Sequence, residues 1–154
     1  MQINSVPAVV VFLFLAACGS SSSPAAPTTA QLAAEYVAAV APSNAALDQL
    51  SAAVKITPMD GAKIRAAAAN LEGADVTLNS GFIDFEKKVP ASVRPHVEAA
   101  RVAVSKDIAD LAAVVSSTDD AGLIATFNVF AVDTTAASAA FVLLRSDLGL
   151  APPT

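Results

Sequence analysis

The stretch "DAGLIATFNVFAVDTTAASAAFVLLRSDLG", residues 120–149, repeats apolar side chains at the spacing of an α-helix. Alternating steps of four and three residues connect its core-forming positions, which are Leu123, Phe127, Phe130, Thr134, Ala137, Phe141, Leu144 and Leu148. Such steps place side chains on one face of a helix. Asp119 and Asp120 stand where a helix has its positive end, and Gly149 is suited to end one. We therefore predict a long helix that buries one face.

Three earlier segments, residues 32–54, 64–89 and 93–115, carry the same spacing. Pro58, Pro90 and the run "SSTDD" at 116–120 separate the four segments, so the connections are short. No segment shows the alternation of a β-strand. Long helices joined by short turns lie antiparallel to their neighbours. The sequence predicts an all-α fold, an up-down-up-down antiparallel four-helix bundle.

Local signals refine the first helix. Thr28 and Gln31 have the spacing of a capping box at its start. The apolar stripe keeps its phase through Pro42, which favours one helix kinked at the proline. The alternative is two shorter helices, with Ser43 or Asn44 capping the second.

Two further signals concern the second and third helices. Asn79-Ser80-Gly81 is the weakest part of the second helix and a possible local break. Ser92 is expected to cap the third helix, with Pro95 in its first turn, where a missing N–H is tolerated.

Charge and composition restrict the function. The 154 residues include 14 acidic and nine basic side chains, a net charge of −5, and every charged residue lies at or after Glu35. An acidic domain is a poor binder of nucleic acid and of anionic lipid headgroups. Abundant alanine favours helix, and the part after the N-terminal segments has the length of one domain.

The N-terminus predicts export. Residues 7–17 form an apolar run that is too short to span a bilayer and suits a signal peptide. The sequence Leu15-Ala16-Ala17-Cys18 resembles the bacterial lipobox, although "MQINS" lacks the usual Lys or Arg. The resemblance implies cleavage before Cys18 and attachment of fatty acyl chains, such as palmitate, to a lipoprotein. The alternative is a core cysteine in an apolar helix.

The expected organisation follows from these assignments. Residues 1–17 are the signal peptide, 18–28 the lipidated cysteine with a Ser/Pro-rich tether, 29–150 the bundle domain and 151–154 a tail. "LAAC", "YVAAVAPSNAALDQL" at 36–50 and "RSDLGLAPP" at 145–153 are similar to small uncharacterised cell-envelope lipoproteins of actinobacteria. That resemblance implies an exported helical domain held on the membrane through Cys18, and supplies no catalytic residues.

Few residues carry chemistry. His96, the single histidine, has Val93 three residues before it, so the Glu-x-x-His pattern of metal-binding bundles is missing, and we expect His96 to be solvated. One histidine and one cysteine cannot supply four zinc ligands. We interpret Asp107 and Asp110 as a solvated helix face and Asp119 and Asp120 as a helix start. The chain is predicted to be no enzyme and to hold no metal or cofactor.

Two apolar groups raise functional hypotheses. The first comprises the phenylalanines beyond the signal peptide, all on predicted core stripes, which either pack in the core or line a pocket for an apolar molecule: Phe82, Phe85, Phe127, Phe130 and Phe141. The second is another stripe on the last helix, roughly 130° from its core face at 100° per residue. Either neighbouring helices cover this second stripe, or it is a contact surface for a partner or a second copy. Its residues are Val129, Val132, Ala136, Ala140 and Leu143.

These observations lead to two functional hypotheses. The first is a lipid-anchored, non-enzymatic module that binds a partner protein of the envelope or another copy of itself. The alternative is a carrier of an apolar small molecule in the bundle core. A cavity lined by the phenylalanines favours the carrier, whereas a solid core with an exposed second stripe favours the partner-binding module.

Overall fold

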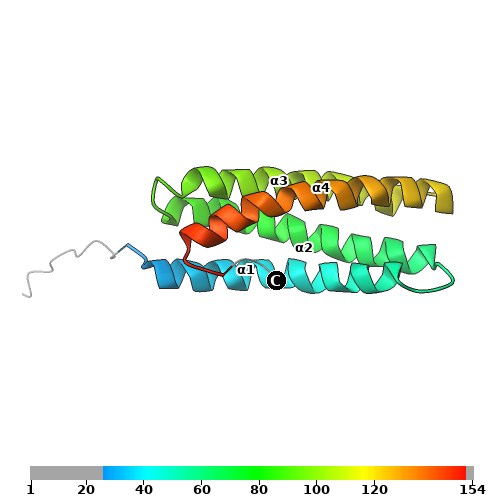
Figure 1. The fold of residues 1–154 in the computed structure, drawn as a ribbon, viewed down its shortest axis with the longest axis horizontal. Coiled ribbons are helices and arrows are strands. Elements are labelled where there is room, and N and C mark those ends of the chain that lie inside the picture. The colour runs from blue at the N-terminus through cyan, green and yellow to red at the C-terminus, as the bar shows by residue number, and fades with distance from the viewer. Residues whose placement is uncertain (1–25, 152–154) are drawn as a thin grey trace, which may run out of the picture.

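A computed structural model, which describes residues 26–151, has four α-helices and no strand in that range (Figure 1). The helices are α1 (Thr29–Val54), α2 (Gly61–Lys88), α3 (Arg94–Ser116) and α4 (Asp120–Asp147). They form the predicted up-down-up-down bundle, in which each helix packs along the one that follows it. The predicted signal peptide, Cys18 and most of the predicted tether lie outside the described residues.

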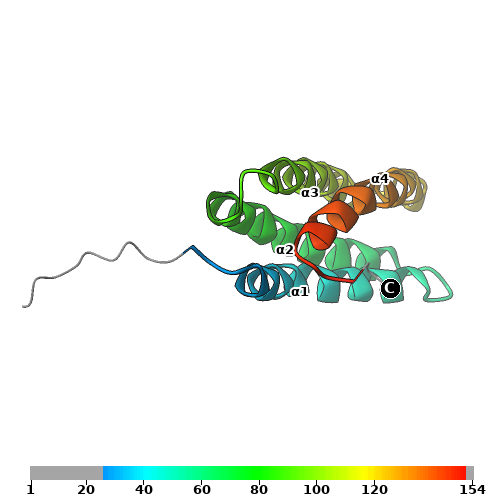
Figure 2. The same cartoon turned by 60° about the vertical axis from the view of Figure 1, so that its left-hand side comes forward.

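The bundle is less closed between its first and last helices. The extensive helix pairs are α1 with α2, α2 with α3, and α3 with α4. In Figures 1 and 2 the residues after α4 turn down toward α1, and Leu150 packs against the core that contains Leu32 and Tyr36. The C-terminal segment therefore joins α4 to α1 near one end of the bundle.

Most local signals are confirmed. Thr28 and Gln31 form the predicted capping box, and α1 continues through Pro42 as one helix. α2 likewise continues through residues 79–81. Asp119 accepts a hydrogen bond from the backbone N–H of Gly122 at 2.7 Å.

The prediction for the start of α3 is wrong. The residue at the N-cap is Val93 rather than Ser92, and no side chain caps the helix. The carbonyl oxygen of Pro90 accepts hydrogen bonds from the N–H groups of Val93 and Arg94, at 2.9 and 3.3 Å. A backbone turn thus replaces the side-chain cap, and the Val93 side chain is buried in the core.

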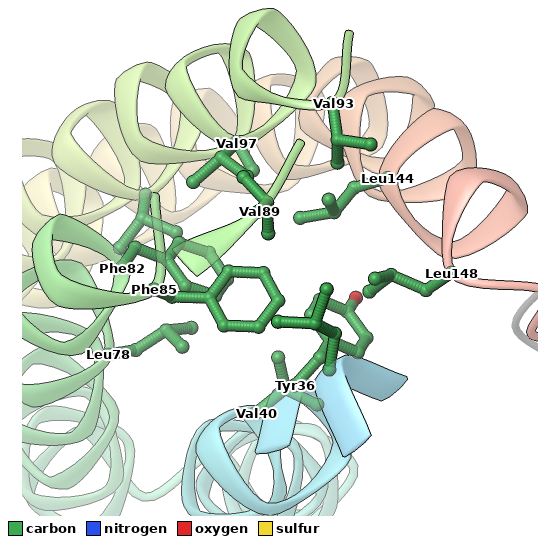
Figure 3. Close-up of a cluster of buried hydrophobic side chains, with 13 residues drawn as sticks. Tyr36, Val40, Leu78, Phe82, Phe85, Val89, Val93, Val97, Leu144 and Leu148 are labelled. Atoms are coloured by element: carbon green, nitrogen blue, oxygen red, sulfur yellow. The ribbon is translucent and has the colours of Figure 1, made fainter. Parts of the chain in front are cut away.

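The interior consists of two hydrophobic cores. One, which we call the aromatic core, is built from Leu32, Tyr36, Val40, Leu78, Phe82, Phe85, Val89, Val93, Val97, Ala100, Val104, Leu144 and Leu148 (Figure 3). The other, which we call the alanine core, is built from Ala46, Leu50, Ala53, Ile64, Ala67, Ala68, Leu71, Leu111, Val114, Leu123 and Phe130. All four helices contribute to both cores.

Aromatic rings organise the first of these cores. The rings of Tyr36 and Phe82 stack with their centroids 6.2 Å apart and an interplanar angle of 8°. Figure 3 shows Phe85 beside them and Leu148, which comes from just after α4, close to Tyr36. The aromatic core therefore bridges the end of α4 and the start of α1.

Ion pairs at the surface join helices that are consecutive in the chain. Lys88 of α2 pairs with Glu35 of α1. Arg101 of α3 lies 3.2 Å from Glu86 of α2, and Lys106 of α3 lies 2.6 Å from Asp133 of α4. Within residues 26–151 no ion pair joins α1 to α4. The space between these two helices borders the site described next.

Candidate ligand-binding cavity

A cavity of about 240 Å³ lies between the two cores and is partly open to solvent. All four helices line it, with the largest contributions from α1 and α4. Tyr36, Phe141 and Arg145 lie toward the aromatic core, and Leu71 and Phe130 belong to the alanine core. The cavity thus has largely apolar walls at both ends, and one end also holds the guanidinium of Arg145.

A polar layer, made of one side chain from each helix, occupies the middle of the cavity. The hydroxyl of Ser43 donates to Oδ1 of Asp75 at 2.7 Å, and the hydroxyl of Thr134 donates to Oδ1 of Asp107 at 3.2 Å. All four side chains line the cavity. On α2 and α3 the aspartates lie between a residue of the aromatic core and a residue of the alanine core, so the layer separates the two cores.

The two aspartates of this layer are buried. Asp75 is 6% exposed and Asp107 is 8% exposed. Burial raises the pKa of Asp107 to about 6; the Thr134 hydroxyl lowers it in part, while the charges of Asp75, Asp110 and Asp133 raise it further. Burial also raises the pKa of Asp75, against a lowering by its hydrogen bond from Ser43. The layer therefore holds carboxylates that are costly to ionise.

Only part of this layer was predicted, because Thr134 was placed on the core stripe of the last helix and the two aspartates were not. Asp107 and Asp110 were predicted to lie on a solvated face; this is wrong for Asp107, which is buried, while Asp110 is half-buried. Asp107 lies three residues after Val104 and four before Leu111, and both of these are buried. Asp75 lies four residues after Leu71 and three before Leu78 in the same way. Both aspartates therefore stand at the three- and four-residue spacing of the buried face of their helix. They are recognised as core positions only if polar residues, and not apolar ones alone, are assigned to that face.

The five phenylalanines do not line one pocket. Phe130 and Phe141 border the cavity. Phe82 and Phe85, 0% and 2% exposed, are packed inside the aromatic core. Phe127 packs against the alanine core, with its ring centroid 5.9 Å from that of Phe130. Three of the five are thus core residues away from the cavity.

The second stripe of α4 lies at the surface. Val129, Val132 and Leu143 are 52%, 70% and 50% exposed, Ala136 is exposed and Ala140 is half-buried. Neighbouring helices therefore leave most of the stripe uncovered. In residues 26–151, α4 is also the helix that is long and apolar enough, by length and composition, to cross a membrane, and 17% of its most apolar segment is buried in the fold.

The remaining candidate residues form no chemical site. His96 is partly exposed, and its Nδ1 contacts the carboxylate of Asp147 at the end of α4. Within the part of the chain that the structure describes, no three His, Cys, Asp or Glu side chains are placed to hold a metal ion. Cys18, the predicted lipidation site, lies outside that part.

No family model matches this chain, and neither a curated protein nor a solved structure matches it. The cavity and the exposed face of α4 are therefore the features from which a function is inferred.

Proposed function

We propose that this protein is a lipoprotein of the cell envelope whose helical domain binds a small, largely apolar molecule. The observation that carries the proposal is the interhelical cavity, which has apolar walls, a polar middle and an opening to solvent. Ligand sites are commonly concave and apolar, with a few polar groups that orient the ligand, and in bundles they lie between the helices.

The cavity volume limits the ligand. Small-molecule sites generally have volumes of about 300–1,000 Å³, and an apolar cavity of about 150 Å³ is enough for benzene. The value of about 240 Å³ falls between the two. A single ring with a short substituent fits such a space, whereas a membrane lipid with two acyl chains does not.

Filling the cavity tests the proposal. Ala137 lines the cavity and Ala136, its neighbour in sequence, is exposed on the outer face of α4. We expect the purified protein to bind 2-phenylethanol in isothermal titration calorimetry. Ala137→Phe should weaken binding at least tenfold because its ring occupies the ligand volume, whereas Ala136→Phe should change it less than twofold.

Two results would contradict the binding proposal. One is the absence of 2-phenylethanol binding by the unaltered protein. The other is equal affinity of the two phenylalanine variants. Ala137→Leu adds less volume and serves if Ala137→Phe fails to fold, which urea denaturation followed by circular dichroism would show.

A second candidate function, binding of a partner protein, is favoured by the outer face of α4. The exposed valines and leucine of that face form an apolar surface on a helix that already packs along α3. Apolar surfaces of this kind often mark interaction sites. Ala136→Phe also tests this function. Its bulky ring on the outer face of α4 should reduce the amount of partner protein captured from envelope extracts, while the affinity for 2-phenylethanol stays the same.

The envelope location depends on Cys18. One acyl chain holds a protein only marginally on a membrane and two hold it stably, so a diacylated cysteine is a sufficient anchor. We expect Cys18→Ala to move the protein from the detergent phase to the aqueous phase in Triton X-114 partitioning. An unchanged distribution of the variant would refute the lipoprotein assignment and would leave the cavity proposal untouched.

A further inference from the structure

The polar layer contains two carboxylates with incomplete partners. A carboxylate has about four acceptor positions. Within residues 26–151, Asp75 accepts one hydrogen bond, from Ser43, and Asp107 accepts one, from Thr134; neither has an ion-pair partner there. Buried carboxylates are normally paired, because their transfer from water is strongly unfavourable without compensation.

The nearby basic side chains interact with groups other than Asp75 and Asp107. Arg145 lines the end of the cavity near Tyr36, where burial raises the pKa of the Tyr36 hydroxyl and Arg145 lowers it in part. The Nε of Arg145 donates to the carbonyl oxygen of Ala151 at 2.8 Å. Lys106 on α3 lies 2.6 Å from Asp133 and 3.4 Å from Asp110. Neither of these side chains pairs with Asp75 or Asp107, so a ligand can supply the positive charge that the two carboxylates lack.

We propose that the ligand is a small organic cation, a protonated amine on an apolar body, with its ammonium group between Asp75 and Asp107. This inference rests on the proposed function and names the ligand class for the same cavity. An ammonium group donates three hydrogen bonds. The carboxylates accept from it, while the Ser43 and Thr134 hydroxyls hold each carboxylate in place.

The walls distinguish an amine from a bare metal ion. The ends of the cavity present Tyr36, Phe141, Leu71 and Phe130, none of which suits the six to eight oxygen ligands of Ca²⁺ or the octahedral shell of Mg²⁺. Aromatic faces attract an organic cation, and aliphatic side chains bury its hydrocarbon part. The site thus combines a negatively charged centre with largely apolar ends, one of which also holds Arg145.

The affinity of a cation is expected to depend on pH. The charged or titratable groups around Asp107 and in the cavity are Asp75 on α2, Asp110 and Lys106 on α3, and Asp133 and Arg145 on α4; α1 contributes Tyr36 and the neutral Ser43 and Asn44. Protonation of Asp107 removes one of the two charges that face the ammonium group. Amine binding should therefore weaken as the pH falls from 7.5 to 5, while binding of a neutral analogue stays unchanged.

Three probes of matched shape test the charge preference on the full-length protein. They are 2-phenylethylamine, the neutral 2-phenylethanol and the anionic phenylacetate, measured by calorimetry at pH 7.5. We expect the amine to bind at least tenfold more tightly than the alcohol, and phenylacetate to bind more weakly than either. Asp75→Asn and Asp107→Asn should each weaken amine binding at least tenfold and change alcohol binding less than threefold.

A matched control removes a carboxylate at the surface. Asp84→Asn alters an exposed aspartate of α2, which pairs with Lys87, and changes the net charge by the same amount as Asp75→Asn. Amine binding by this variant should stay within twofold of the unaltered protein. A larger loss would assign the preference to overall charge and overturn the role of the buried pair.

The remaining outcomes separate the two proposals. Equal binding of amine and alcohol, unaffected by either buried variant, overturns the cation inference and leaves the cavity function standing. Binding of phenylacetate in preference to the amine also overturns the inference. Absence of binding by all three probes contradicts both proposals.

Discussion

The aromatic and alanine cores solve the same packing problem with side chains of different size. In the aromatic core, rings of Tyr36, Phe82 and Phe85 fill the space between helices, and α4 and the segment after it reach α1 through Leu144 and Leu148. In the alanine core, α1 and α2 meet through short side chains, among them Ala53 and Ala68. Rings fill wide gaps, whereas alanines require close approach of the helices. The cavity lies where these two kinds of packing meet.

The largest expected effect comes from truncating one ring of each core, a fully packed ring in the aromatic core and a ring that borders the cavity in the alanine core. Phe82 is 0% exposed and contacts three other rings, so Phe82→Ala should lower the free energy of unfolding by about 3–5 kcal/mol. Phe130, 3% exposed, borders the cavity and leaves fewer contacts to lose. Phe130→Ala should cost less than Phe82→Ala, near the lower end of the same range, about 3 kcal/mol. Urea denaturation of both variants measures the difference.

Equal losses for the two variants would contradict the contrast between a fully packed ring and a ring beside a cavity. A loss below about 1 kcal/mol for Phe82→Ala would mean that the aromatic core is not well packed.

The next effect concerns the layer between the cores. The pKa of Asp107 is raised to about 6 in the folded protein, above the ordinary 3.8, so between these values the folded state binds more protons than the unfolded state. Stability from this group therefore rises as the pH falls from about 7 to about 4, by about 3 kcal/mol in total. Asp75, whose pKa is also raised, acts in the same direction.

Asp107→Asn isolates that effect. At pH 7 it should raise the free energy of unfolding by about 2 kcal/mol, and it should flatten the gain between pH 7 and pH 5. Asp84→Asn is the control, because the pKa of Asp84 is lowered by its hydrogen bond with Lys87 and its contribution lies below that window. Thermal melts across the pH range measure both variants. A gain that persists unchanged in Asp107→Asn would contradict the assignment.

The smallest expected effect is on the outside of α4. Val132 is 70% exposed and Leu143 is 50% exposed, so glutamate at either position should change the free energy of unfolding by about 0.5 kcal/mol or less. A greater loss would mean that another copy or a partner stabilises this face in the measured sample. Sedimentation velocity of the same variants separates these cases, because loss of association changes the sedimentation coefficient.

The helices were predictable because their cores repeat at steps of three and four. The stripe from Leu123 to Leu148 and the continuous phase through Pro42 both depend on helix geometry alone. The start of α3 was not predictable in this way. The carbonyl oxygen of Pro90 accepts hydrogen bonds from backbone N–H groups at the start of α3, where a side-chain cap from Ser92 was expected. A backbone turn leaves no side-chain signature in the sequence.

The site was less predictable than the fold. Of the five phenylalanines predicted to line a pocket, Phe130 and Phe141 border the cavity. The other three pack in or against the two cores. Which ring borders an open space depends on how four helices meet, and this is a tertiary property. Asp75 and Asp107 carried a local signal in their spacing from buried residues, but Asp107 was interpreted as part of a solvated face and Asp75 was not singled out.

The polar layer also bears on how the four helices slide against one another. Small side chains are nearly interchangeable, so an alanine-rich bundle has alternative alignments of similar packing quality. Ser43 and Asp75 meet in one alignment, and a shift of α1 by one turn would bury the carboxylate without that donor. The pair Thr134 and Asp107 sets the offset of α3 and α4 in the same manner. The layer thus specifies the longitudinal register of the bundle, as single buried polar residues do in coiled coils.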